Sequence, residues 1–321
     1  FPQFALHRWA GYACAALAVV HLALQWERAA AYLRGLGRPR RSEAARVPER
    51  APLTGRREFL WALLAGLGGF LLGWLAPSGR DQREDDLGLG YHLWSKAGWA
   101  GLPRLLDWGS RPAAVKSYPA APHVPLPDPR GDHAMSLMEA VELRRSRREY
   151  VAGPLSLEEL SCLLHASGGI TDPRHGFRAV PSAGALYPLE TYAVVHDVAG
   201  LEAGLYHYAV ADHALEQLQT GDLRASMVVG GLGQEMLGRA QVCLLLAAVF
   251  QRTRWRYRER AYRYVMLEAG HSGQNLYLAA TALGLGACAV GAFLDDDLNR
   301  LVGLDGREEA LVYVVAVGRV A

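Results

Sequence analysis

The sequence predicts an α+β domain that follows two membrane-spanning helices. Two segments near the start, residues 9–26 and 59–77, contain no Asp, Glu, Lys or Arg. Later in the chain, strand-like and helical patterns are mixed without the strict alternation of a parallel sheet, which favours the α+β class. We therefore divide the chain into an anchor at 1–80, an arm at 81–134 and a folded domain at 135–321.

Both uncharged segments have about the length that crosses ~30 Å of hydrocarbon. Two helices of a soluble core are the alternative, which the uninterrupted apolar composition disfavours. Between the segments, residues 28–57 carry nine Arg and two Glu, and positive charge in a short loop marks the cytoplasmic side. We expect this loop in the cytoplasm, the anchor in the lipid bilayer of the cell membrane, and the rest of the chain outside the cytoplasm.

Arg56 and Arg57, just before the second apolar segment, resemble a twin-arginine translocation signal, which exports folded proteins. Two ordinary arginines on the cytoplasmic side are the alternative. No small-residue cleavage site follows them, so we expect an uncleaved anchor. Because the chain begins at Phe1 instead of Met, we also expect residues upstream.

The arm is predicted to be extended, because prolines follow one another at short intervals in the Pro- and Gly-rich stretch 98–133. The domain then opens with two capped helices, one from Met135 and one over 155–166; their N-caps, Ser136 and Ser156, are each followed three residues later by Glu. A long amphipathic helix is predicted over 260–283. Strands are predicted at 190–195, 204–208, 215–218, 242–249 and 311–317.

The continuous apolar run 242–249 is typical of a central strand that is buried on both faces. The net charge of +2 and the lack of a basic, aromatic stripe give no case for nucleic-acid binding. The four cysteines lie far apart without paired spacing, so neither a zinc site nor a disulfide framework is indicated.

Three motifs suit a phosphorylated, flat ligand. The run Arg144–Arg148 combines guanidiniums with the hydroxyl of Ser146, a set of donors that matches phosphate oxygens; a solvated helix face is the alternative. The small residues of Pro181–Gly184 and of the expected loop at Leu285–Gly291 would let backbone N–H groups approach a ring closely.

Together and in this order, these motifs resemble the FMN-dependent nitroreductase superfamily, and within it the SagB-type dehydrogenase branch, from about Tyr91 to the C-terminus. Further matching stretches are Lys116–Pro119, Arg145–Tyr150, Val180–Glu190, Gly204–Tyr208, Arg260–Tyr264 and Glu268–His271. The resemblance implies a nitroreductase-like fold, bound FMN and a homodimer formed through the flavin domain.

The resemblance also implies which residues contact FMN. The phosphate and ribityl end would be held by Arg144, Arg145, Ser146 and Arg148, with Arg319 near the phosphate. One side of the isoalloxazine would be lined, across the dimer interface, by Pro181, Ser182, Ala183 and Gly184. The other side would be lined by Gly286, Ala287, Val290 and Gly291. Glu190 would accept from a flavin N–H or would cap the sheet.

Arg256 and Tyr257 stand where azoline-oxidising relatives of this branch often show Lys-Tyr. Tyr257 is the candidate general acid or base, with a packed aromatic as the alternative. Arg256 does not deprotonate near neutrality, so it would act only as an electrostatic group. The exchange of Lys for Arg counts against azoline oxidation.

His7 and His21 are candidate ligands of haem b iron in the membrane. They are fourteen residues apart in the sequence, so in a helix they would share one face at an axial separation of about 21 Å. Interfacial histidines that contact headgroups are the alternative. The second apolar segment contains no His, so the opposing ligands would come from elsewhere.

These observations predict a membrane-anchored, FMN-dependent oxidoreductase that exchanges electrons with a membrane cytochrome or quinone. Reduced nicotinamides are cytoplasmic, whereas the flavin domain is expected outside. The alternatives are a tethered NAD(P)H-dependent nitro- or quinone reductase and a non-catalytic flavin-fold subunit of a respiratory complex.

Overall fold

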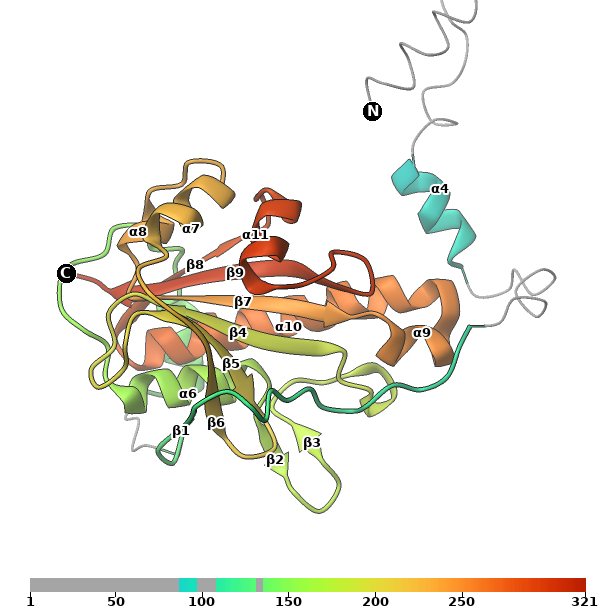
Figure 1. Ribbon diagram of the computed structural model, residues 1–321, viewed down its shortest axis with the longest axis horizontal. Coiled ribbons are helices and arrows are strands. Elements are labelled where there is room, and N and C mark those ends of the chain that lie inside the picture. The colour runs from blue at the N-terminus through green and yellow to red at the C-terminus, as the bar shows by residue number, and fades with distance from the viewer. Residues whose placement is uncertain (1–86, 97–107, 131–134) are drawn as a thin grey trace, which may run out of the picture. The chain divides into compact units, whose positions relative to one another are not determined.

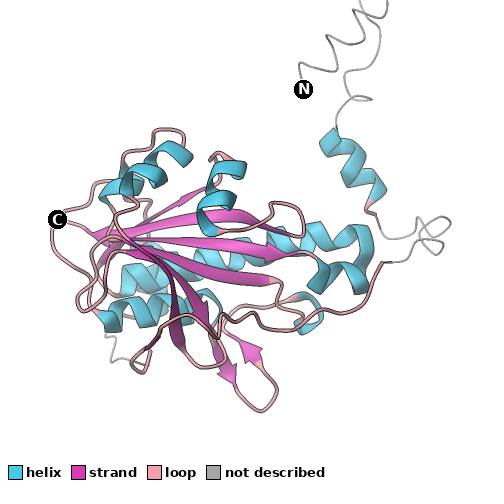
Figure 2. Ribbon diagram, viewed as in Figure 1, coloured by secondary structure: helices cyan, strands magenta, loops and turns pink. Residues whose placement is uncertain are grey.

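A seven-stranded antiparallel sheet forms the centre of the fold in the computed structural model, which describes residues 87–96, 108–130 and 135–321 (Figures 1 and 2). Its strands follow the order β1-β6-β5-β4-β7-β9-β8, and a separate hairpin pairs β2 with β3. The strands are β1 (His123–Pro125), β2 (Ile170–Asp172), β3 (Phe177–Arg178), β4 (Leu189–Val195), β5 (Gly204–Ala209), β6 (Ala214–Thr220), β7 (Val242–Val249), β8 (Leu285–Val290) and β9 (Glu309–Arg319).

Helices cover both faces of this sheet. The helices are α4 (Leu87–Trp94), α5 (Leu137–Leu143), α6 (Leu157–Gly168), η2 (Ala183–Ala185), α7 (Arg224–Gly230), α8 (Met236–Arg239), α9 (Gln251–Tyr257), η3 (Arg258–Arg260), α10 (Ala261–Ala282) and α11 (Asp295–Val302). Side chains of α6 and α10 pack on one face, and those of α7, α8 and α11 pack on the other (Figure 1). The predicted α+β class is confirmed.

Strand β7 is buried on both faces, as its continuous apolar run predicts. Val242 and Leu244 join the core on the side of α6 and α10, while Cys243 and Leu245 join the core on the side of α7 and α8. Each large apolar side chain buried in this way stabilises the fold by roughly 1.5–3 kcal/mol. The two-sided burial explains why no polar residue interrupts the strand.

The helix starts follow the predicted caps. Ser156 accepts from the backbone N–H of Glu159, whose side chain accepts from Ser156 in return, which completes a capping box for α6. Ser136 accepts from the N–H of Glu139 at the start of α5. The expectation of a loop at 285–291 is wrong for its first six residues, which form the edge strand β8 paired with β9.

The small residues of β8 have a packing reason. A Cβ added at Gly286 would lie 2.3 Å from Val320 and 2.8 Å from the Cβ of Arg147. At Gly286 the neighbouring chain therefore passes too closely for a side chain, and residues that give no alternating apolar pattern nevertheless form a strand.

Where the structure describes it, at 108–130, the arm contains no helix; it has a turn at residues 119–120 and the short strand β1. The range 81–134 also contains helix α4, which the proline spacing does not predict because α4 precedes the prolines. The two expected membrane segments, His7 and His21 lie outside the described residues. No helix in 87–96, 108–130 or 135–321 combines the length and the apolar composition needed to cross a bilayer.

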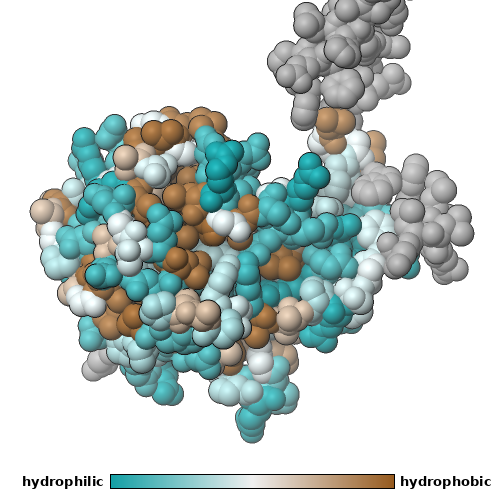
Figure 3. Space-filling model, in the orientation of Figure 1, coloured by the Kyte–Doolittle hydropathy of each residue, from teal (hydrophilic) through white to brown (hydrophobic). Residues whose placement is uncertain are grey.

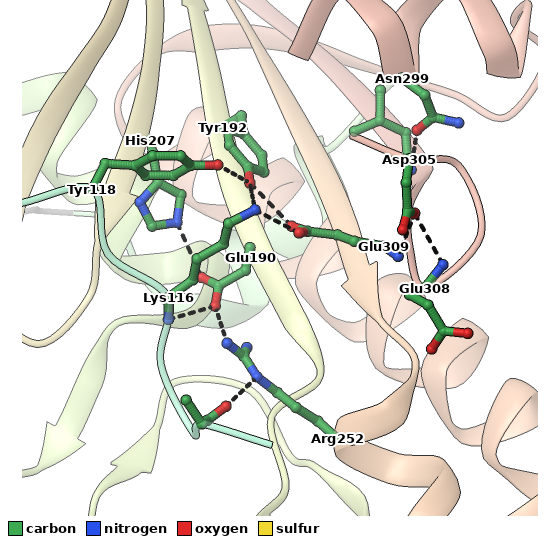
Figure 4. A network of polar contacts seen from close by, with 12 residues as sticks. Lys116, Tyr118, Glu190, Tyr192, His207, Arg252, Asn299, Asp305, Glu308 and Glu309 are labelled. Atoms are coloured by element: carbon green, nitrogen blue, oxygen red, sulfur yellow. Dashed lines mark hydrogen bonds and ion pairs between the residues drawn. The ribbon is translucent and has the colours of Figure 1, made fainter. Parts of the chain in front are cut away.

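Two buried carboxylates, Glu190 and Glu216, fasten the arm to the sheet, and Figure 4 shows the contacts of Glu190. Glu190 accepts from the backbone N–H of Lys116 at 3.0 Å, and Glu216 accepts from that of Tyr118 at 2.7 Å. The imidazole of His207 lies between them, 2.6 Å from Glu216 and 3.2 Å from Glu190. Arg252 forms an ion pair with Glu190 at 2.5 Å. Glu190 thus has the guanidinium of Arg252, an imidazole and a backbone N–H around it, and Glu216 has an imidazole and a backbone N–H.

A second set of contacts holds the side chain of Lys116. Its Nζ lies 2.5 Å from Glu309 and donates to the hydroxyl of Tyr192 at 2.9 Å. Tyr192 donates in turn to Glu309, and the hydroxyl of Tyr118 lies 3.0 Å from that of Tyr192 (Figure 4). The backbone of the arm is therefore bound to β4 and β6, and the side chain of Lys116 is bound to β4 and β9.

Replacing Glu216 with Ala should lower the free energy of unfolding by about 3–5 kcal/mol, because it leaves the buried His207 and the N–H of Tyr118 without their acceptor. Urea unfolding followed by circular dichroism measures this. Asp297→Ala is the control, since it breaks an exposed pair with Arg300 that is worth under about 1 kcal/mol. Equal unfolding midpoints for the two variants would contradict the anchoring role.

Candidate functional site

The Arg-Ser run lies along the edge strand of the sheet. Ser146 forms a parallel bridge with Ala287 of β8, and the N–H of Arg147 donates to the carbonyl of Ala287 at 2.9 Å. Two motifs that are far apart in the sequence are thus neighbours in the fold. Because the pairing uses backbone groups, the side chains of the run remain available.

The side chain of Tyr277, on α10, holds this run against β8. Its hydroxyl accepts from the N–H of Ala289 at 2.8 Å and lies 2.9 Å from the hydroxyl of Ser146. The guanidinium of Arg144 lies over the same ring, 5.3 Å from its centroid. One aromatic residue therefore orients both Ser146 and Arg144.

The arginines of the run carry uncompensated charge. Arg145, Arg147 and Arg148 are exposed, Arg144 is half-buried, and none of the four forms an ion pair with another described residue. Arg145 donates only to the carbonyls of Glu142 and Arg144. Clustered guanidiniums repel one another, so such a group suits an anion with several oxygens, such as a phosphate.

Arg319 differs from these arginines because its charge is already paired. Its guanidinium donates to Glu159 at 2.9 Å and to the carbonyl of Pro154 at 2.8 Å. It thereby joins the last strand to the capped start of α6. The structure gives this residue a role in packing that its place in the sequence does not reveal.

A second group of candidate residues lies at η2. Gly184 has a φ of +63°, and the non-glycine residues Ala185 and Tyr187 also have positive φ, at 52° and 45°. Such backbone is costly for residues with a Cβ, so its neighbours must hold it in place. One restraint is the hydroxyl of Ser182, which accepts from the N–H of Tyr187 at 2.9 Å.

Arg256 and Tyr257 meet this turn. A Cβ added at Gly184 would lie 2.7 Å from the hydroxyl of Tyr257 and 3.2 Å from the guanidinium of Arg256. The ring of Tyr257 packs edge-on against that of Tyr264 at 4.9 Å. The turn that the sequence predicts to face the flavin ring therefore lies beside the predicted catalytic pair, Arg256 and Tyr257.

Behind the turn lies a buried acid that sequence reasoning did not single out. Glu268 of α10 is 3% exposed. Burial raises the pKa of Glu268 to about 7, although the nearby hydroxyl of Ser182 and the charges of Arg178 and Arg252 lower it. An acid on the buried face of the predicted amphipathic helix is the signal that could have revealed it.

The remaining candidate residues have other surroundings. Glu190 uses its oxygens for Arg252, His207 and the N–H of Lys116. Ala287 and Val290 are buried in the cores on the two faces of the sheet, while Gly291 is exposed just after β8. Pro181 is exposed and Ala183 is half-buried beside Gly184.

The two groups of residues lie on opposite faces of α10. Tyr277 contacts Ser146, whereas Glu268 lies near enough to Ser182 for that hydroxyl to lower its pKa. Since 277 − 268 is nine residues within α10, the two side chains are separated by about 13.5 Å along the axis and by a half-turn around it. One chain therefore presents the Arg-Ser run and the η2 turn on different sides.

Known proteins resemble this chain in sequence and in structure. The model of the nitroreductase family matches residues 141–319. A protein of Methanocaldococcus jannaschii, provisionally named a nitroreductase, is 41% identical over 185 residues, which cover 58% of this chain and 91% of that protein. The microcin B17-processing protein McbC of Escherichia coli is 30% identical over 171 residues, 52% of this chain and 63% of McbC.

Among solved structures, a protein of Anabaena variabilis that is provisionally named a nitroreductase matches with a TM-score of 0.58 at 28% identity. The match covers 73% of this chain and 47% of the Anabaena chain. The chain thus spans less than two thirds of McbC and about half of the Anabaena protein.

Replacing Gly184 with Ala should destabilise the domain more than the same change at Gly233. Both positions have positive φ, which costs about 1–2 kcal/mol for a residue with a Cβ, but a Cβ at Gly233 meets nothing within 4 Å. The additional loss of stability at Gly184 therefore reports the contact with Tyr257. Thermal unfolding of the two variants measures this difference. In a Tyr257→Phe background the excess should shrink; an unchanged excess would contradict the contact.

Proposed function

The chain belongs to the nitroreductase family of FMN-dependent oxidoreductases, and we propose that it acts as a SagB-type dehydrogenase whose FMN lies between two copies of residues 135–321. The observation that carries this proposal is a set of four arginines around Ser146 that form no ion pair with another described residue: Arg144, Arg145, Arg147 and Arg148. Such a set of donors suits an anion with several oxygens, and the FMN phosphate is one.

The residues fit FMN at both of its ends. Arg144, Arg145, Arg148 and Ser146 would hold the phosphate and ribityl chain, and the exposed backbone around Gly184 would face the ring. Bound FMN would supply the redox chemistry by exchanging a hydride with substrate, while the protein supplies binding and orientation.

The dimer is proposed from the faces of α10. Because one chain presents the Arg-Ser run and the η2 turn on different sides of this helix, a second copy could bring its turn to the first copy's run. Exposed apolar side chains on α5 and α10 would be covered in such a dimer: Leu137, Met138, Val141, Met266 and Leu267. Large apolar patches of this kind mark association surfaces.

Tyr257 and Arg256 are proposed to contact substrate. The hydroxyl of Tyr257 can donate or accept a proton, and the guanidinium of Arg256 stays charged and would stabilise negative charge beside Gly184. The processing role in the name of McbC supports a peptide substrate. Arg256 in place of Lys removes a group that could take up a proton, so a redox step other than azoline oxidation fits better.

We further propose that the protein is membrane-anchored, with the flavin domain outside the cytoplasm after twin-arginine export. The support is the sequence of residues 1–80, which lies outside the described part. His7 and His21 would ligate haem b, and electrons would pass between flavin and haem or quinone. A tethered NAD(P)H-dependent reductase requires the opposite topology, and a non-catalytic subunit requires no substrate turnover.

The double variant Arg145→Ala, Arg148→Ala should lose bound flavin, because two of the phosphate's charged donors disappear. Flavin absorbance of the purified protein, relative to protein content, measures this. The matched control is Arg174→Ala, Arg300→Ala, which removes two exposed arginines elsewhere and should retain flavin. Full retention in the Arg145, Arg148 variant would overturn the proposed phosphate site.

Cysteine labelling of intact cells tests the topology. A cysteine at exposed Ser110 should react with an impermeant maleimide without lysis, whereas one at Ser42 in the basic loop should react only after lysis. The unsubstituted protein gives the background from its own cysteines. Labelling of Ser110→Cys only after lysis would favour the NAD(P)H reductase, and absence of haem b from pyridine haemochrome spectra of the complex would remove His7 and His21 as ligands.

A further inference from the structure

Helix α4 docks on the chain just beyond the candidate catalytic pair, and it belongs to the same compact unit as the domain. The ring of Tyr91 packs edge-on against that of Tyr262 on α10, with 6.5 Å between the centroids. The guanidinium of Arg263 lies 5.7 Å from the centroid of the Tyr91 ring. The hydroxyl of Tyr91 donates at 3.2 Å to the carbonyl of Glu259, two residues after Tyr257. The stretch where the family resemblance begins thus contacts the segment that carries the pair.

Two arginines of that segment bind the carboxyl-terminal end of α4. Arg260 donates to the carbonyl of Ser95 at 3.0 Å, and Arg263 donates to the carbonyl of His92. The last carbonyls of a helix have no partner within the helix, and this end carries partial negative charge, so guanidiniums satisfy both needs. Ser95 is 4% exposed. The docking of α4 therefore depends on directed hydrogen bonds as well as on ring contacts.

Arg260 connects α4 to Tyr257. Besides its bond to Ser95, its Nε donates to the hydroxyl of Tyr264 at 3.1 Å, and its guanidinium lies 5.7 Å from the centroid of that ring. Tyr264 packs edge-on against Tyr257, whose hydroxyl lies 2.7 Å from the place of a Cβ at Gly184. A continuous series of contacts therefore runs from α4 to the turn that is proposed to face the flavin ring.

The backbone directly after Tyr257 needs such support. Arg258 has a φ of 54° and a ψ of −131°, a conformation that glycine adopts readily and that is costly for a residue with a Cβ. Strain of this kind persists only where the surrounding structure holds it. The N–H of Arg258 is held by the carbonyl of Arg254, and the carbonyl of Glu259 is held by Tyr91. Without α4, the link between α9 and α10 would relax, and Tyr257 would move with it.

We propose that Tyr91 and Arg260 are positioning residues for the candidate catalytic tyrosine: by docking α4, they hold the hydroxyl of Tyr257 against the turn at Gly184. The proposal rests on the proposed function in one respect, namely that Tyr257 is the group that contacts substrate. Tyr91 acts from outside the turn, through the strained link and through the ring of Tyr264. The candidate pair is therefore in place only when α4 is docked.

Thermal unfolding of the full-length protein, as purified, tests the proposal through a mutant cycle. Gly184→Ala introduces a Cβ that meets the hydroxyl of Tyr257, whereas Gly233→Ala introduces one that meets nothing within 4 Å. The difference between the two losses of melting temperature, termed the Gly184 difference, therefore reports where that hydroxyl lies. A merely structural contribution of Tyr91 lowers both melting temperatures and leaves the Gly184 difference unchanged.

The Gly184 difference is measured in the wild-type background and in three variant backgrounds. Tyr91→Ala removes the ring and the hydroxyl that dock α4, and Tyr91→Phe removes only the hydroxyl that donates to Glu259. Tyr206→Phe is the matched control for Tyr91→Phe. It also removes a hydroxyl that donates to a backbone carbonyl, that of Glu202 before β5, outside the series of contacts.

We expect the Gly184 difference to fall by about 2–4 °C in Tyr91→Ala and by less in Tyr91→Phe, since coupled residues are not additive. It should keep its wild-type value in Tyr206→Phe. An unchanged difference in Tyr91→Ala overturns the proposal, as does an equal fall in Tyr206→Phe or a wild-type background without any difference. If Tyr91→Ala does not fold, an unchanged difference in Tyr91→Phe overturns it.

The outcome is separate from that of the proposed function, because melting temperatures do not require bound FMN. Flavin absorbance of the same samples tests the proposed function. Bound flavin without the coupling leaves the proposed function and removes only the role of α4. Coupling in a protein that binds no flavin leaves the positioning of Tyr257 and removes the proposed function.

Discussion

The imidazole of His207, held between the carboxylates of Glu190 and Glu216, determines how the arm crosses the sheet. A buried carboxylate without donors is strongly unfavourable, so the two acids require His207, Arg252 and the arm's N–H groups to be in place together. This couples β4, β5, β6 and α9 to a segment that has almost no regular structure. Arg252 belongs to the helix that ends at Tyr257. The same network therefore also holds the helix that carries the candidate catalytic pair.

Helix α10 organises the rest of the candidate site. Glu268 faces the η2 turn, and nine residues later Tyr277 faces the Arg-Ser run. Ser272 and Asn275 bind the backbone of the segment that leads from α6 to the turn, at Ser167 and at Ala166 and Ala179. The helix therefore sets the spacing of the two groups, while its apolar exposed side leaves room for a second copy. The molecule also exposes apolar side chains at the end of α7 and in the loop that follows it, Val229 and Leu232, and Figure 3 shows brown, apolar surface in this region.

The sequence predicts those parts of the fold whose signals are local. The run 242–249 is strand β7 because a two-sided core tolerates only apolar residues, and Ser156 with Glu159 caps α6 because that geometry needs only neighbouring residues. The loop expected at strand β8 follows from Gly and Ala residues that give no alternating pattern, although close passage of Arg147 and Val320 requires the glycine at 286. The pair His207 and Glu216 depends on the register of β5 against β6, which a single sequence does not specify. The membrane segments and the haem ligands lie outside the described residues and stay predictions.

The candidate site also differs from a Lys-Tyr site in which groups can change charge. Arg256 carries a permanent positive charge, whereas a Lys at this place could release its proton. Glu268, which burial gives a pKa of about 7, is 3% exposed and is too buried to exchange a proton with substrate directly. The exchange of a titratable Lys for a permanent cation therefore leaves the hydroxyl of Tyr257 as the group of the candidate pair that can transfer a proton, with Arg256 as a fixed charge beside it.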